Sequence, residues 1–372
     1  MPVGQLSNPR RLARGRSSRA WPLVLCAVLL VAGCSATSAS LETAEPDGSP
    51  TTTTTPQREV IVIDGQPVRA MFIPDEEQGP VYAMTDQTLY HRLSGRWEPT
   101  RAENDGRAIL IDPTNPERLF RGDHPTCGLD GAQPEIPFEV SHDGGMSWRV
   151  QPQGRDIQPF LIDPSIPDTL YGSSCFLAIS TTTGNTWMRL ALMEDFPLTD
   201  IAFAGEQLLI LGTSLDGVSR LRKVDVTDPA KPLLGELLLE IPGHASLDTR
   251  GERIVVGGVE TVYVSDDLGT TWTDSRIGLE TVTSSVAPEP GRPSGEGADE
   301  IGVHVVRLGI GDKRRIYAGT SHGLYISQDG GATWVRYDEI ALNAVVTDIQ
   351  FAIGGADLYV TTDAGVVTVP NP

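Results

Sequence analysis

Basic side chains are scarce in this chain of 372 residues, which holds 29 Lys and Arg against 49 Asp and Glu. All five charged residues before Cys34 are arginines, so the rest of the chain carries 24 basic and 49 acidic side chains. A protein that binds nucleic acid needs a basic surface to neutralise the phosphates. The charge balance therefore excludes nucleic acid from the expected partners.

A long apolar run is also missing. The most apolar segment, residues 21–32 (WPLVLCAVLLVA), is too short for the roughly 20 residues of a membrane-spanning helix. It follows an arginine-rich leader, and this order is typical of a secretory signal peptide. The segment ends in Val31, Ala32, Gly33 and Cys34, which resembles the lipobox of bacterial lipoproteins.

The lipobox resemblance implies that residues 1–33 are a signal peptide and that Cys34 is the lipidation site. It also implies export, with a lipid anchor in the outer face of the cytoplasmic membrane of a bacterium. Ordinary cleavage and an uncleaved anchor are the alternatives. Residues 34–57 are rich in Ser, Thr and Pro and too poor in apolar surface to fold. They predict a flexible tether with a reach of about 25–30 Å.

Cysteine is scarce, with four residues in the chain. After the lipobox, Cys127 and Cys175 follow comparable segments, residues 119–122 (LFRG) and 170–173 (LYGS). Because an exported chain can form disulfides, we expect these two cysteines to pair and to join neighbouring structural units. A reactive or metal-binding thiol is the alternative, but the sequence offers no clustered partners for it.

Glycine and proline are abundant, with 39 and 28 residues, which favours many short strands joined by tight turns. The chain also repeats itself. Residues 141–148 (SHDGGMSW), 265–272 (SDDLGTTW) and 327–334 (SQDGGATW) share the pattern S-x-D-x-G-x-[ST]-W. Residues 180–187 (STTTGNTW) have threonine in place of the aspartate, and residues 94–97 (SGRW) are a shortened copy. The intervals fit repeats of about 40–45 residues, the period of propeller blades.

The repeated motif predicts a turn between two short strands. Its carboxylate can accept backbone N–H groups, its glycine supplies a positive φ, and its Ser or Thr hydroxyls add local hydrogen bonds. Its tryptophan would bury its ring between adjacent blades. Because such a turn needs no ligand, we expect a structural role for all of its members. These members are Ser141, Asp143, Gly145, Trp148, Ser180, Gly184, Trp187, Ser265, Asp267, Gly269, Trp272, Ser327, Asp329, Gly331 and Trp334.

The motif resembles the aspartate box of bacterial neuraminidase repeats, which is also found in sortilin-type and photosystem II assembly-factor-type propellers. Residues 111–120 (IDPTNPERLF) and 162–171 (IDPSIPDTLY) resemble the strand-turn-strand segment that precedes the box in those repeats. The resemblance covers residues 58–372. It implies an all-β fold, a single propeller built from four-stranded antiparallel sheets.

Apolar alternation predicts where the blades begin. The predicted starts lie near Val60, Ala108, Pro159, Thr199, Ala245, Gly302 and Val346. Seven starts indicate seven blades, with six or eight as alternatives because residues 199–239 contain no box. The last blade is one strand short, and we expect residues 59–63 to complete it and to close the ring.

The name of the repeat raises the question of sialidase activity. A sialidase needs three arginines around the substrate carboxylate, a tyrosine nucleophile with its glutamate, and an acidic group. The F/Y-R-I-P motif of that family has its nearest counterpart in residues 71–74 (MFIP), which lack the arginine, and Arg69 is out of register. We therefore assign no catalytic residue. A glycoside hydrolase or a carbohydrate-binding propeller is the alternative, although aromatic residues make up only 6% of the chain.

We expect neither a cofactor nor a metal site. Asp123, His124 and Asp130, and the pair Asp266 and Asp267, supply ligand atoms without the spacing of a calcium loop. The alternative is a calcium ion bound at a loop, and only the high density of acidic residues supports it.

Two inserted segments, residues 121–137 and 287–300, do not help to build a blade, and binding residues are often carried on such loops. We therefore predict a non-catalytic propeller that binds a protein or an envelope component through one loop-bearing face. Tolerated surface insertions are the alternative reading of both segments.

Overall fold

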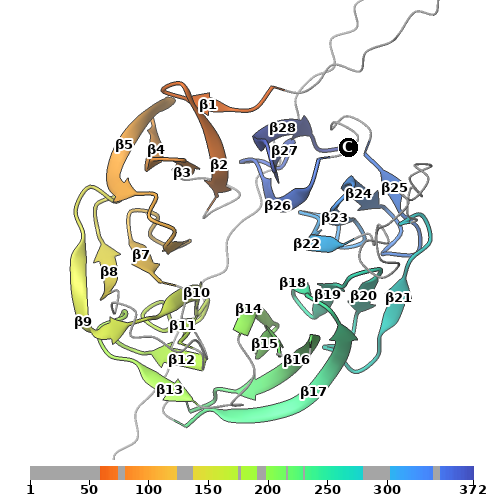
Figure 1. The fold of residues 1–372 in the computed structure, drawn as a ribbon. Coiled ribbons are helices and arrows are strands. Elements are labelled where there is room, and N and C mark those ends of the chain that lie inside the picture. Colours follow the sequence, from red (N-terminus) through yellow and green to blue (C-terminus); the bar gives the residue numbers. More distant parts are fainter. Residues whose placement is uncertain are drawn as a thin grey trace, which may run out of the picture. The chain divides into compact units, whose positions relative to one another are not determined.

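The computed structural model describes residues 59–73, 80–123, 137–174, 177–190, 198–214, 217–228, 231–279, 302–337 and 344–372. Over these residues the chain forms strands and no helix. The strands make seven antiparallel sheets around a central axis, as the blades of a propeller (Figure 1). The predicted all-β class and the predicted seven blades are confirmed.

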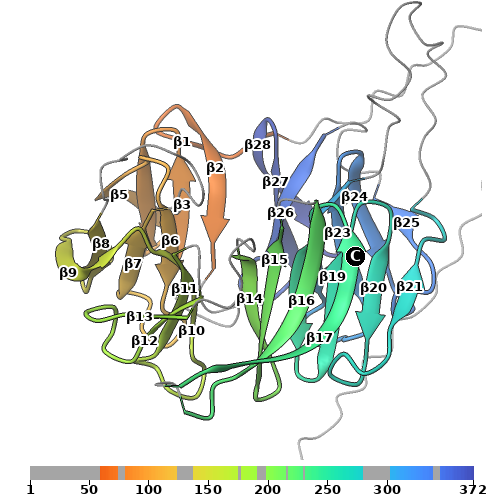
Figure 2. The same ribbon diagram turned by 60° about the horizontal axis from the view of Figure 1, so that its bottom comes forward.

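Within each blade the strands pair in the order of the chain, as Figure 2 shows for β14 to β17. Blade 1 contains β1 (Val62–Ile63), β2 (Gln66–Phe72), β3 (Val81–Thr85), β4 (Thr88–Leu93) and β5 (Arg96–Glu103). Blade 2 contains β6 (Ala108–Ile111), β7 (Leu119–Gly122), β8 (Pro137–Ser141) and β9 (Arg149–Arg155). Blade 3 contains β10 (Gln158–Ile162), β11 (Leu170–Ser173), β12 (Leu177–Ser180) and β13 (Met188–Leu190).

The second half of the ring repeats this plan. Blade 4 contains β14 (Leu198–Ala204), β15 (Gln207–Thr213), β16 (Val218–Asp225) and β17 (Leu233–Pro242). Blade 5 contains β18 (Ser246–Arg250), β19 (Arg253–Gly257), β20 (Val262–Ser265) and β21 (Thr273–Ser275). Blade 6 contains β22 (Val303–Leu308), β23 (Ile316–Thr320), β24 (Gly323–Ser327) and β25 (Val335–Arg336), and blade 7 contains β26 (Val346–Phe351), β27 (Asp357–Thr362) and β28 (Gly365–Pro370).

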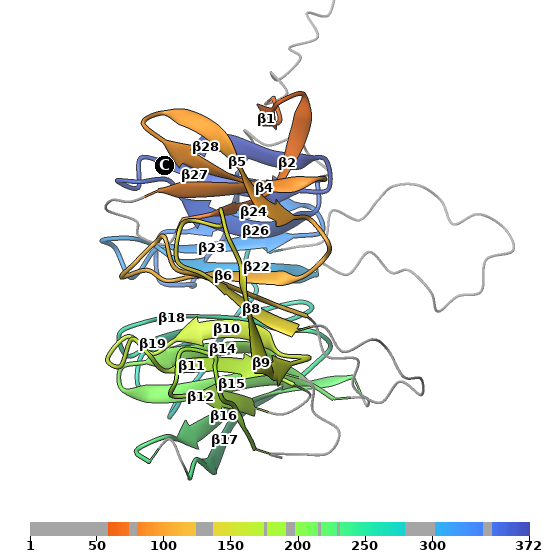
Figure 3. The same cartoon turned by 90° about the vertical axis from the view of Figure 1, so that its left-hand side faces the viewer.

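The connections between strands alternate between the two faces of the ring, which Figure 3 shows edge-on. Counting from the innermost strand, the first-to-second and third-to-fourth connections share one face, here called the turn face. It includes residues 112–118 and 142–148. The second-to-third connections and the links between blades share the other face, here called the insertion face. It includes the connection from Gly122 to Pro137 and the link from Ser275 to Val303.

The core is divided among the seven interfaces between blades. Seven clusters of buried apolar side chains each draw their members from two adjacent blades. Between blades 2 and 3, for example, Phe120 and Phe138 pack with Leu170. The first and last blades are joined in the same way, because Val366 of β28 packs with Met71 of β2. Burial of this apolar surface therefore stabilises the whole ring rather than separate sheets.

The innermost strands of blades 2 to 7 begin within one residue of the predicted positions. The prediction for blade 1 was wrong. Its innermost strand, β2, begins at Gln66 rather than near Val60. The reason is a turn at Asp64 and Gly65, which have positive φ angles of 50° and 77° and reverse the chain first.

The strand that closes the ring is shorter than expected. Val60 forms a single antiparallel bridge with Val367, and the N–H of Ile61 donates to the carbonyl of Val366 at 2.8 Å. Val62 and Ile63 then leave β28 and pair with β2 as strand β1. Residues 60–61 therefore take the fourth-strand position of blade 7, while residues 62–63 add a strand to blade 1.

Candidate functional site

The complete copies of the repeated motif all occupy one position in the fold. They join the third and fourth strands of blades 2, 3, 5 and 6, so they lie together on the turn face. The shortened copy, residues 94–97, takes the same place between β4 and β5. The copies thus mark equivalent hairpins rather than converging on a single site.

A carboxylate spans the turn of blade 2. Oδ2 of Asp143 accepts a hydrogen bond from the Ser147 hydroxyl at 2.6 Å, and Oδ1 accepts the Ser147 backbone N–H at 2.8 Å. The Ser141 hydroxyl donates to Oδ1 at 2.9 Å. The corresponding bonds form around Asp267 in blade 5 and Asp329 in blade 6. Each carboxylate is therefore committed to closing its own turn.

Blade 3 closes the same turn without a carboxylate. Oγ1 of Thr182 accepts the N–H of Thr186 at 2.8 Å, and the Ser180 hydroxyl accepts the N–H of Gly184 at 2.9 Å. A neutral hydroxyl thus replaces the carboxylate as the acceptor of the backbone N–H that closes the turn. A group that only accepts a structural hydrogen bond can be replaced in this way, whereas a catalytic acid cannot.

The motif aspartates have lowered pKa values. Hydrogen bonds from the side chain and backbone of Thr333 lower the pKa of Asp329 to about 2. The hydroxyls of Ser147 and Thr271 lower the pKa of Asp143 and Asp267 in the same way. A carboxyl group that is ionised throughout the neutral range cannot donate a proton as a general acid. Their titration therefore agrees with a structural function.

The motif glycines lie where two blades touch. Gly145, Gly184, Gly269 and Gly331 have positive φ angles of 80–98°. A Cβ at Gly184 would lie 2.5 Å from Cε1 of Phe138 in the preceding blade, and a Cβ at Gly269 would lie 2.7 Å from a methyl carbon of Leu238. At these positions both the backbone conformation and the close approach require glycine.

We expect Gly184→Ala to lower the free energy of unfolding by about 2–5 kcal/mol, because a left-handed φ and an overpacked interface both cost stability. Urea unfolding would measure the loss. Gly311→Ala is the matched control, since Gly311 has a φ of 76° and a Cβ added there would meet no atom within 4 Å. Equal losses in the two variants would contradict the close packing at Gly184.

The motif tryptophans lie at blade interfaces, but only one of them is fully buried. Trp334 is 4% exposed, packs with Val264 of blade 5, and donates from Nε1 to the Ser275 hydroxyl at 2.8 Å. The other three rings stay partly exposed and donate to the carbonyl of their own motif glycine at 2.9–3.1 Å; they are Trp148, Trp187 and Trp272. The expectation of buried rings therefore holds fully for Trp334 and only in part for the rest.

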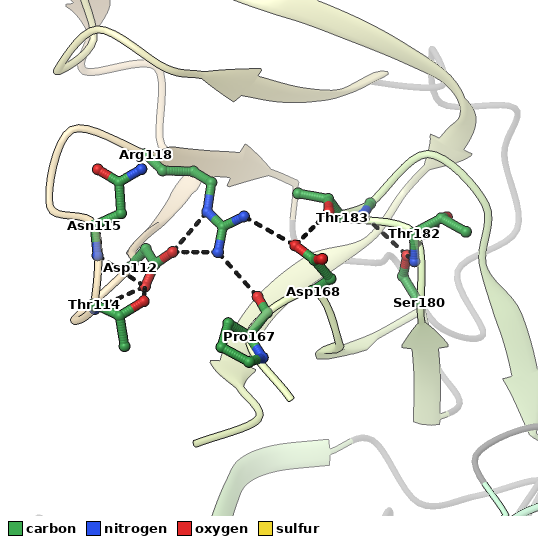
Figure 4. A network of polar contacts seen from close by, with 10 residues as sticks. Asp112, Thr114, Asn115, Arg118, Pro167, Asp168, Ser180, Thr182 and Thr183 are labelled. Carbon is green, nitrogen blue, oxygen red and sulfur yellow. Dashed lines mark hydrogen bonds and ion pairs between the residues drawn. The ribbon is translucent and has the colours of Figure 1, made fainter. Parts of the chain in front are cut away.

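A polar network joins blades 2 and 3 on the turn face (Figure 4). Asp112 is fully buried and accepts the N–H of Thr114 at 2.8 Å, which fixes the turn between β6 and β7. Nε of Arg118 donates to the other carboxylate oxygen at 2.6 Å. The same guanidinium crosses to blade 3, where it donates to the carbonyl of Pro167 at 2.9 Å and pairs with Asp168 at 3.2 Å.

The network continues into the motif of blade 3, where the Thr183 hydroxyl and N–H donate to the side chain and carbonyl of Asp168 at 3.2 and 3.0 Å. In the other three blades that carry the complete motif, the N–H at this motif position makes the same backbone hydrogen bond. The pairs are Gly144 with Glu117, Leu268 with Glu252, and Gly330 with Arg314. The motif turns are thus fastened to the neighbouring turn of their own blade, so much of the polar backbone of this face is already satisfied.

Four charged side chains near the axis were missed by the sequence analysis. Asp200, Asp248, Arg307 and Asp348 belong to the innermost strands of blades 4, 5, 6 and 7. Nη2 of Arg307 donates to Oδ1 of Asp348 at 2.9 Å. A signal was present, because each aspartate is the third residue of its strand (LTD, SLD and VTD). We call these four residues the axial cluster.

Several predicted sites lie outside the described residues. Cys34, Cys127 and Cys175 are among them, as are His124, Asp130 and residues 287–300. The lipidation and the disulfide therefore stay predictions. Of the acids considered as metal ligands, Asp266 pairs with Arg253 at 3.3 Å and Asp267 closes its motif turn.

In the part of the chain that the structure describes, no three His, Cys, Asp or Glu side chains are grouped so as to hold a metal ion. Within the same residues, no helix has the length and apolar character needed to cross a membrane.

No protein-family model matches the chain, and no curated protein does. Similar solved structures include a GH74 xyloglucanase from Xanthomonas campestris, with a TM-score of 0.57 and 15% identity over 85% of this chain and 53% of the enzyme. The chain thus spans about half the length of that enzyme. YCF48 bound to D1 peptide matches with a TM-score of 0.51 and 14% identity over 82% of this chain and 95% of that one. U3-55K matches with a TM-score of 0.53 and 12% identity over 85% and 98% of the two chains. At these identities the likeness shows the β-propeller fold alone.

Proposed function

We propose that this protein is an exported, lipid-anchored propeller that binds a protein or another envelope component through its insertion face and catalyses no reaction. One observation carries the proposal. The strands that border both long inserted segments end on the same face, at Gly122 and Pro137 in blade 2 and at Ser275 and Val303 between blades 5 and 6. Loops above a rigid scaffold commonly carry binding residues.

The opposite face supports this assignment by its chemistry. Its motif turns use their carboxylates, hydroxyls and backbone N–H groups on one another.

The comparison with YCF48, whose structure contains a D1 peptide, supports protein binding at the level of the fold. A propeller of similar extent there presents a surface to a peptide. The comparison with the xyloglucanase supports the alternative, a carbohydrate-active or carbohydrate-binding propeller. A surface cavity of about 390 Å³ lies beside the motif of blade 6, and one of about 380 Å³ lies on the insertion face, between the end of β17 and the connection from β19 to β20. Among the described residues that line them, each has one aromatic side chain, Tyr337 and Tyr263. Carbohydrate-binding sites usually stack the sugar on several aromatic rings, so we favour a protein partner.

Deletion of residues 287–300 is the test of the binding face. We expect it to weaken capture of a partner from solubilised envelopes while the melting temperature stays nearly unchanged, because loop positions seldom carry core packing. His142→Ala, an exposed change on the turn face, is the matched control. Capture that survives the deletion but is lost in the control would reverse the assignment of faces. Turnover of chromogenic glycosides, or binding on a glycan array, would instead establish the alternative.

The anchor has its own test. Cys34→Ala removes the thiol that lipid attachment needs, so we expect the protein to leave the membrane fraction or to accumulate as an unprocessed precursor. Fractionation followed by mass determination of the N-terminal peptide would measure both results. Membrane association that is unchanged in the variant would show that another segment holds the protein there.

A further inference from the structure

The axial cluster contains two carboxylates that Arg307 leaves without a hydrogen bond. The three guanidinium nitrogens of Arg307 donate to Asp348, to the carbonyl of Ile349 at 3.2 Å and to the carbonyl of Val306 at 3.0 Å. Among the residues that the structure describes, Asp200 and Asp248 therefore accept hydrogen bonds only from backbone N–H groups. Charged carboxylates that are partly buried and lack a bonded cation are expensive in free energy.

Each of these carboxylates reaches across a boundary between blades. Oδ2 of Asp200, in blade 4, accepts the N–H of Leu247 in blade 5 at 3.3 Å. Oδ2 of Asp248, in blade 5, accepts the N–H of Leu308 in blade 6 at 2.6 Å. The innermost strands of blades 4, 5 and 6 are thus linked in series by the two acids.

The charges around the two acids do not cancel. The charge of Asp200 interacts with those of Arg307 and Asp248, and the charge of Asp248 interacts with those of Arg307 and Arg250. Arg307 also serves Asp348, so its charge is shared among three carboxylates. Two like charges at a partly buried junction favour the uptake of a proton by one of them.

We propose that Asp200 and Asp248 form a proton-binding site that strengthens the junction of blades 4, 5 and 6 in weakly acidic solution. Burial is the main cause that raises the pKa of Asp200, to about 6, and burial raises the pKa of Asp248 as well. A carboxyl with a raised pKa in the folded state contributes stability at low pH and loses that contribution as the pH rises through the folded pKa. Lowering the pH from 7.5 to 5 should therefore increase the folding equilibrium constant about tenfold through Asp200 alone.

Two histidines act in the opposite direction. Burial lowers the pKa of His91 and of His304, so their protonation disfavours the folded state as the pH falls. The stability profile of the whole protein is consequently a sum, and the contribution of the axial cluster must be measured as a difference between variants.

The test compares the wild type with Asp200→Asn and Asp248→Asn, by urea unfolding at pH 7.5 and pH 5. We expect Asp200→Asn to remove the tenfold pH effect, and a ¹³C titration of the side-chain carboxyls in the folded wild type to find one group near pH 6. Asp225→Asn is the control, because bonds from Thr227 lower the pKa of Asp225 and keep it ionised in this range. The proposal is overturned if both axial variants differ from the wild type by a pH-independent amount. Titration of all carboxyls below pH 5 would overturn it as well, even if a variant failed to fold.

Discussion

Replacing Trp334 by alanine is expected to lower the free energy of unfolding by about 3–5 kcal/mol. The ring is 4% exposed and fills the interface between blades 5 and 6, so its removal leaves a cavity among Val264 and the neighbouring apolar side chains. The change also removes the indole N–H, which donates a hydrogen bond to the Ser275 hydroxyl at 2.8 Å. Urea or thermal unfolding monitored by circular dichroism would measure the effect, since a loss of this size is a large share of a domain's stability.

Trp148→Ala is the comparison that gives this result its meaning. Trp148 has the same motif position in blade 2, but its ring is partly exposed and is covered by the guanidinium of Arg121 at 4.4 Å. We expect a smaller loss of stability there. A Trp334→Ala protein that melts normally but no longer binds its partner would place the motif at a recognition surface and would contradict the structural assignment.

Blade number and blade boundaries could be read from the sequence because both depend on local chemistry. A motif turn needs a hydroxyl, a hydrogen-bond acceptor and a glycine at fixed spacing, and each of these interactions is completed within eight residues. The innermost strands could be read as well, since their apolar alternation reflects burial against neighbouring blades. The motif occurs in blades 2, 3, 5 and 6 and in a shortened form in blade 1, and apolar alternation marks the innermost strands of blades 4 and 7, so one poor copy, such as that of blade 3, does not hide the pattern.

Ring closure depended on a contact between distant parts of the chain, and the sequence predicted it only roughly. Residues 59–63 look like one uniform apolar strand, yet Val60 and the N–H of Ile61 bond to β28, whereas the carbonyl of Ile61 and residues 62–63 bond to β2. The division is set by the turn at Asp64 and Gly65 and by the position of Val367, which is about three hundred residues away in the chain. No pattern within the segment itself records that competition.

The axial cluster escaped notice for a similar reason. An aspartate at the third residue of a strand is ordinary, and only the ring brings Asp200, Asp248 and Asp348 around a single arginine. The sequence also did not predict how deeply each tryptophan is buried, because burial depends on the side chains that the ring meets in the fold. Trp334 meets Val264 and a serine hydroxyl, whereas Trp148 meets the side chain of Arg121.

Removing the guanidinium of Arg118 is expected to destabilise the domain by about 3–5 kcal/mol, because it leaves a buried carboxylate without its counterion. Asp112 has no exposed surface, and Arg118 is its only ion-pair partner among the described residues. Arg118→Met keeps much of the side-chain volume, so the loss would report the charge rather than a cavity. The bonds to Pro167 and Asp168 would be lost at the same time, which also loosens blade 3 from blade 2.

Two further variants separate the buried pair from an ordinary surface pair. Arg69→Met breaks the 2.7 Å pair between Arg69 and Asp86, whose side chains are 39% and 49% exposed, and should cost much less stability than the buried pair, because solvent screens exposed charges. The double variant Asp112→Asn, Arg118→Met should recover part of the loss, since the buried group that remains is neutral and can still accept the N–H of Thr114. Urea unfolding of the four proteins measures all of these values. A loss in Arg118→Met as small as that in Arg69→Met would mean that water reaches Asp112, and the network would then not fasten blades 2 and 3 together.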